Sequence, residues 1–88
     1  MNFDLQLFSE RNLSNQTPNQ LRKGIRSLQK KLDLHLAKIN EPWKSYSDWF
    51  SEPDKQRGRI EHWQHEIRNF EESIQNRIDE LAKRGEQP

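Results

Sequence analysis

The chain has 88 residues, a single-domain length near the lower end of what buries an adequate core. Hydrophobic residues make up 30% and charged residues 33%, so a thin core is expected. The formal net charge of +1 gives no global attraction to nucleic acid or lipid, and the lack of cysteine excludes disulfides and thiolate metal sites and suits a reducing compartment.

Residues 1–16 are predicted to form an N-terminal tail. The tail lacks the basic start and apolar run of a secretory signal, and no stretch approaches the about 20 apolar residues of a membrane span, so we expect a soluble protein without a membrane partner. One interpretation is an unstructured terminus. The other is a docking segment, because four large apolar side chains lie within six residues: Phe3, Leu5, Leu7 and Phe8.

A first helix is predicted over residues 18–40. Thr17 suits the N-cap, Pro18 the first helical position, and Gln20 completes a capping box. Its apolar stripe has alternating spacings of 4 and 3 residues, which is the pattern of a helix that packs on another helix: Leu21, Ile25, Leu28, Leu32, His35 and Ile39. Leu36 is expected to widen this stripe, and Pro42 to prevent the helix from continuing.

A second helix is predicted over residues 54–84, with Ser51 and Asp54 as a cap and Gly85 just past its end. Its expected stripe runs through Ile60, Trp63, Ile67, Phe70, Ile74, Ile78 and Leu81. Residues 42–53 form an aromatic connector. Its aromatic side chains are interpreted as closing the end of a hairpin, with an exposed partner-binding cluster as the alternative: Trp43, Trp49 and Phe50.

The predicted fold is all-α: an antiparallel hairpin of two long amphipathic helices over residues 17–85. One hairpin removes little apolar area from water, so we expect either the tail and connector to complete the core, or two hairpins to pair into a four-helix bundle. A homo-oligomer is slightly favoured.

Residues that could carry chemistry are few, so no enzyme, cofactor or metal site is predicted. His62 and His65 could share a metal, but the sequence pairs no further ligands with them unless the hairpin places His35 opposite. The carboxylates alternate with cations along a solvated face rather than in a pocket. A basic stripe on the first helix could follow phosphates or complement an acidic partner: Arg22, Arg26 and Lys30.

Two segments carry a resemblance. Residues 3–8, Phe-Asp-Leu-Gln-Leu-Phe, resemble the short opening of many head-associated proteins of phages and prophages of Gram-positive bacteria. The stretch from Leu21-Arg22-Lys23-Gly24-Ile25 through His62-Trp63 to residues 74–81 is similar to small helical proteins of uncharacterised activity from the same phages. The resemblance implies a structural or assembly role, with the tail as docking element, in the bacterial cytoplasm or the virion.

Three functions follow as hypotheses. The leading one is a non-enzymatic, head-associated accessory protein that acts through protein–protein contact with a phage structural protein. The second is a small phage-encoded inhibitor of a host or defence protein, which needs only the same rigid helical surface. The third is a nucleic-acid-binding helical module that uses the basic first helix.

Overall fold

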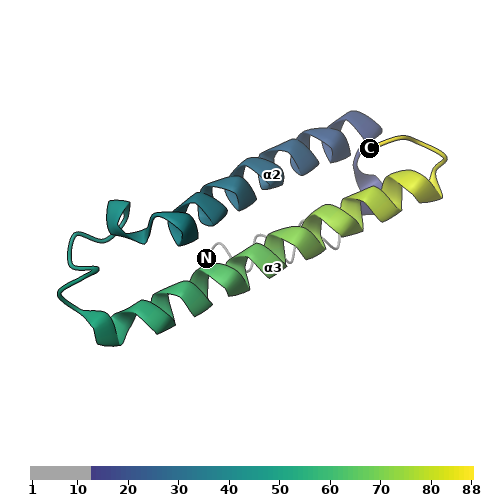
Figure 1. The fold of residues 1–88 in the computed structure, drawn as a ribbon. Helices are drawn as coiled ribbons and strands as arrows, with labels where there is room; N and C mark the ends of the chain where they lie inside the picture. Colours follow the sequence, from purple (N-terminus) through teal and green to yellow (C-terminus); the bar gives the residue numbers. More distant parts are fainter. Residues whose placement is uncertain (1–12) are drawn as a thin grey trace.

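The computed structural model describes residues 13–88 as two long antiparallel helices, shown side by side in Figure 1. A short 3-10 helix η1 (Leu13–Asn15) precedes α2 (Pro18–Asn40), and a second one, η2 (Pro42–Lys44), lies in the connector before α3 (Pro53–Lys83). The predicted all-α hairpin is confirmed, and both helices begin and end within one residue of the predicted positions.

The start of α2 is capped as the sequence predicts. The Thr17 hydroxyl accepts a hydrogen bond from the Gln20 backbone N–H at 3.2 Å, and the Gln20 side-chain oxygen accepts one from the Thr17 N–H at 2.8 Å. This capping box satisfies two backbone donors that a helix start would otherwise leave open. Pro18 follows at the first helical position, where its missing N–H costs nothing.

The predicted cap of α3 by Ser51 is wrong. The Ser51 hydroxyl donates to the Asp48 carbonyl in the connector at 3.1 Å, and Glu52 occupies the N-cap position without a side-chain hydrogen bond. The other end of α3 agrees with prediction. Gly85 has a φ of 76°, and the N–H groups of Gly85 and Glu86 bond back to the Ala82 and Leu81 carbonyls, which is a Schellman ending.

The helices meet along their apolar stripes, which the structure buries unevenly. Five of the predicted stripe residues are buried: Leu21, Leu32, Trp63, Ile67 and Leu81. The rest are half-buried: Ile25, Leu28, Ile39, Ile60, Phe70, Ile74 and Ile78. Leu36 does not widen the buried stripe, since 49% of it is exposed. Two helices cover only part of their stripes.

Arg77 occupies a position that the sequence analysis assigned to Ile78. Arg77 is only 8% exposed, whereas Ile78 is half-buried. The alternation of 4 and 3 residues through Ile67, Phe70 and Ile74 continues to residue 77, so the helix turns Arg77 toward α2. Gly24 makes room there, because a Cβ on Gly24 would lie 2.9 Å from Arg77 Nε. The close approach at Gly24 therefore accommodates a side chain rather than a backbone.

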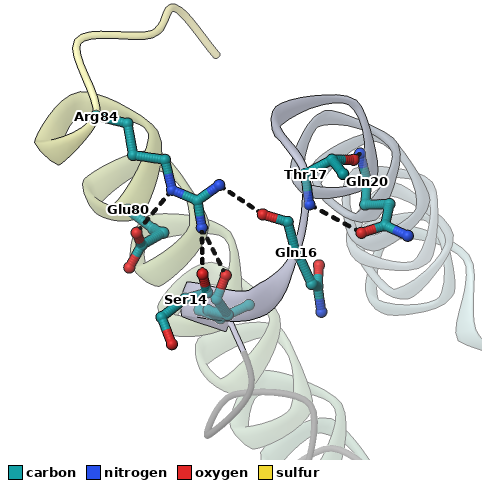
Figure 2. A network of polar contacts seen from close by, with 7 residues as sticks. Ser14, Gln16, Thr17, Gln20, Glu80 and Arg84 are labelled. Carbon is teal, nitrogen blue, oxygen red and sulfur yellow. Dashed lines mark hydrogen bonds and ion pairs between the residues drawn. The ribbon is translucent and has the colours of Figure 1, made fainter.

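The last residues of the predicted tail belong to the packed body. Leu13, in η1, is buried with Leu21 and Leu81 in one apolar cluster. Arg84 at the end of α3 holds this segment: its guanidinium donates to the carbonyls of Leu13 at 2.9 Å, Ser14 at 3.1 Å and Gln16, while its Nε pairs with Glu80 at 2.9 Å (Figure 2). Residues 13–16 of the predicted tail thus pack against the start of α2 and the end of α3.

Candidate interaction surfaces

The closed end of the hairpin is an aromatic cluster around Trp63 of α3. Trp63 is buried, and the rings of Trp49 and Tyr46 pack on it with centroids 6.4 and 5.7 Å away. The Arg59 guanidinium lies over the Tyr46 ring, 3.8 Å from its centre. The connector therefore packs onto the first half of α3, and Trp49 closes the hairpin as predicted.

An ion pair fixes the connector to α3. Arg59 binds both carboxylate oxygens of Asp48, at 2.8 and 3.1 Å, a bidentate geometry that holds both side chains in one orientation. These hydrogen bonds lower the pKa of the Asp48 carboxyl below its usual value and raise the pKa of Arg59. The Gln56 amide also donates to the Trp49 carbonyl at 2.7 Å. The backbone on either side of the buried indole is thus held in place.

The other two connector aromatics are exposed, contrary to the prediction that they close the hairpin. Trp43 is 47% exposed and Phe50 is 74% exposed, and their rings stack on each other with centroids 6.1 Å apart. Trp63, Trp49 and Tyr46 already fill the end of the hairpin, which leaves this pair outside. We call Trp43 and Phe50 the aromatic tip.

Charges near the aromatic tip are mostly paired or acidic. Lys44 binds Glu41 at 2.7 Å, next to Trp43. Residues 41–55 hold four carboxylates and two lysines: Glu41, Asp48, Glu52 and Asp54, with Lys44 and Lys55. Arg57 and Arg59, the latter paired with Asp48, bring the net charge of residues 41–59 to zero, so this surface does not attract phosphate groups. Exposed aromatic side chains are frequent anchors of protein–protein contacts.

The hairpin register brings His35 opposite the predicted histidine pair. Glu66 contacts His35 Nε2 through one carboxylate oxygen and His62 Nε2 through the other, the latter at 2.8 Å. His35 Nδ1 lies 2.9 Å from the Lys31 carbonyl, and Phe70 packs edge-on against its ring. Because the carboxylate lies between the imidazoles, this cluster connects the helices by hydrogen bonds. Within residues 13–88, no group of three or more His, Asp or Glu side chains has a geometry that could hold a metal ion.

The predicted basic stripe is interrupted at its first member. Arg22 binds the C-terminal segment, with Glu86 at 3.0 Å and the Gln87 carbonyl at 2.9 Å, and it also donates to Asn19. Figure 1 shows this segment returning toward the start of α2. Arg26 and Lys30 are exposed. The structure therefore uses one of the three cations for folding and leaves two on the outer face of α2.

The predicted docking residues Phe3, Leu5, Leu7 and Phe8 lie outside the described residues. Two contacts inside the described part had no signal in the sequence analysis, the Arg59–Asp48 pair and the clamp made by Arg84. Residues far apart in the sequence meet in both, and local spacing carries no information on such pairs. Glu80 and Arg84, four residues apart on one helix, form an ion pair of the kind that alternating carboxylates and cations favour.

Comparison with known proteins adds no relative. No family model matches the chain, and neither a curated protein nor a solved structure matches it. Across residues 13–88, no helix combines the length and apolar character that crossing a membrane requires.

Proposed function

We propose that the protein is a non-enzymatic accessory factor of phage head assembly, which acts by binding another protein through the aromatic tip. One observation carries the proposal: Trp43 and Phe50 are exposed and stacked on each other at the end of a rigid hairpin. When a partner covers large apolar side chains of this kind, their unfavourable contact with water is removed, and they lose little conformational freedom.

The support beneath the tip makes it suited to binding. Trp49 lies one residue before Phe50 in the chain and is held in the core against Trp63, and the Asp48–Arg59 pair fixes the residue before it. A ring on such a support is already ordered before binding, which reduces the entropy that association costs. The surroundings carry no net positive charge, which favours a protein partner with an apolar pocket over a nucleic acid.

The place of action comes from the sequence resemblance of residues 3–8 and 21–81 to phage head-associated and neighbouring helical proteins. The predicted localisation is accordingly the cytoplasm of the bacterial host, the virion, or both. Within this proposal the tail residues Phe3, Leu5, Leu7 and Phe8 form a second docking element.

Incorporation into phage heads tests the proposal. The full chain, a Trp43→Ala/Phe50→Ala double variant and a Leu34→Ala control are expressed with the head genes of the same phage, and purified heads are analysed by mass spectrometry. Leu34 is a suitable control, because it is a 63% exposed apolar residue on α2, outside the aromatic tip. We expect the wild type and the control to be present in the heads and the double variant to be absent. The circular dichroism spectra of all three proteins should be the same.

Two outcomes would contradict the proposal in different ways. Absence of the wild-type chain from heads and from head-assembly intermediates would refute the assembly role. Normal incorporation of the double variant would refute the aromatic tip as the docking surface. A chain lacking residues 1–9 then tests the tail: it should keep the helical signal and thermal stability, and its loss from heads would assign docking to the tail.

A further inference from the structure

The described residues form a single layer of helices. The principal extents are 51 × 23 × 14 Å, and the smallest is close to the diameter of about 10–12 Å of one α-helix with its side chains. Stable domains generally need two packed layers, because each element must bury its apolar stripe against another. A layer of two helices has two broad faces, and within residues 13–88 no further α-helix covers either of them.

The two broad faces differ in chemistry. Contacts between the helices identify one of them: His35 of α2 meets Glu66 of α3, and Gly24 meets Arg77, so these residues lie on the same side. We call this side the polar face. It is occupied by hydrogen-bonded groups, which include the Arg77–Ser73 contact at 2.9 Å.

Helical geometry places a set of aliphatic residues on the opposite side. Ile25 follows Gly24, and Leu36 follows His35, and each is rotated about the helix axis by about 100° from the residue before it. Ile25 and Leu36 therefore lie on the other side of the α2–α3 contact from Gly24 and His35. On α3, Ile67 follows Glu66 and Ile78 follows Arg77 in the same way. Ile60 lies seven residues, or about two helical turns, before Ile67 and so on the same side. We call these residues the isoleucine face: Ile25, Leu36, Ile60, Ile67 and Ile78.

The isoleucine face is incompletely covered. Ile25, Ile60 and Ile78 are half-buried, and Leu36 is 49% exposed, although each belongs to or adjoins the stripe that packs between the helices. Polar side chains lie along its margins, with Gln29, Gln64 and Glu71 exposed. An apolar centre with a polar rim is the usual composition of a protein interface.

We infer that the isoleucine face binds a second copy of this chain, face to face, and so forms a four-helix bundle. Two observations favour a second copy as the occupant. The broad side of the molecule, on which the isoleucine face lies, measures 51 by 23 Å and leaves room for the roughly 800 Å² per partner of a standard interface. The same face on both copies is also self-complementary in chemistry, aliphatic on aliphatic, as a two-fold dimer requires.

The inference goes beyond the proposed function, since the aromatic tip is made of connector residues outside the isoleucine face. A dimer would present two aromatic tips. The oligomeric state of the pure chain decides whether a second copy or a different protein binds the isoleucine face.

Two leucines on α2 provide a matched pair for the test. Leu36 belongs to the isoleucine face, while Leu34 is two residues, and hence about 200°, away on the helix. Both are exposed, at 49% and 63%, so neither substitution opens a cavity in the core. The variants are Leu36→Lys, the milder Leu36→Ala, and Leu34→Lys as the control.

Sedimentation equilibrium of the full chain over a concentration series measures the result. We expect a wild-type dimer at micromolar concentration, a dimer dissociation constant raised about tenfold or more by Leu36→Lys, and an unchanged constant for Leu34→Lys. Far-UV circular dichroism checks that each variant is helical. If Leu36→Lys loses helicity, Leu36→Ala decides, because alanine preserves the helix and removes only apolar area.

Three results would overturn the inference. The first is a wild-type chain that stays monomeric and helical up to high micromolar concentration. The second is equal weakening by Leu36→Lys and Leu34→Lys, which would place the contact on another face. The third is a helical Leu36→Ala or Leu36→Lys variant with the wild-type dissociation constant.

Discussion

At the open end of the hairpin, where α2 begins and α3 ends, apolar side chains are covered completely: Leu21 and Leu81 are 0% exposed. The chain segments before α2 and after α3 cross this end, and Arg84 and Arg22 hold them by hydrogen bonds. At the closed end the connector contributes more apolar area, yet two of its aromatic rings remain in water.

The two ends differ in how many of their apolar side chains packing uses and how many remain exposed for binding. Leu13 covers the small aliphatic cluster of Leu21 and Leu81 at the open end. The closed end is filled once Trp49 and Tyr46 have packed on Trp63, and Trp43 and Phe50 are in excess. Substitutions in the two sets should therefore have different effects.

The largest effect is expected at the centre of the closed end. Trp63→Ala removes the ring on which Trp49 and Tyr46 pack, and should lower the free energy of unfolding by about 3–5 kcal/mol. Phe50→Ala removes an exposed ring and should change it by less than about 0.5 kcal/mol. Urea denaturation followed by circular dichroism measures both. Similar losses in the two variants would mean that the aromatic tip is part of the core.

The next effect concerns the clamp at the open end. Arg84→Ala leaves three backbone carbonyls without their charged donor and should cost about 1–3 kcal/mol. Arg57→Ala is the control, because Arg57 also pairs with a glutamate four residues away but is 90% exposed in its side chain, and should cost about 0–0.5 kcal/mol. Thermal denaturation at one protein concentration compares them. Equal costs would show that the hydrogen bonds from Arg84 to the segment before α2 contribute nothing to stability.

A pair of glycines distinguishes a tight helix contact from an open one. Nothing lies within 4 Å of a Cβ placed on Gly58, so Gly58→Ala should raise stability by about 0.5–1 kcal/mol through helix propensity alone. Gly24→Ala should not give this gain, because its Cβ would meet Arg77 Nε at 2.9 Å. Urea denaturation midpoints report the difference. A gain of the same size at Gly24 would show that Arg77 moves away at no cost.

The smallest effect is a pH dependence at the closed end. The pKa of Asp48 is lowered in the folded chain by its hydrogen bonds to Arg59, so the pair stabilises the fold above the unfolded pKa of Asp48 and this contribution is lost as the pH falls through the folded pKa. Asp48→Asn should be less stable than the wild type at neutral pH, and the difference should vanish in acid. Thermal denaturation at several pH values measures it; a difference that persists in strong acid would contradict the linkage.

Much of this fold follows from local sequence. The capping box at Thr17 and Gln20, the proline at position 18 and Gly85 after α3 set the helix ends through contacts within a few residues. The regular spacing of Leu21, Leu32, Trp63 and other apolar residues predicted two helices that pack on each other. Interactions of this range depend only on neighbours along the chain, which the sequence displays directly.

The tertiary structure decided which of several equivalent residues are covered. Arg77 rather than Ile78 faces α2, because the space above Gly24 exists only when the two helices are in register. Trp49 is buried and Phe50, its neighbour, is exposed, because Trp63 accepts one indole and the chain turns the next ring away. The space between packed elements holds only some of the candidate side chains, and composition alone does not indicate which ones fill it.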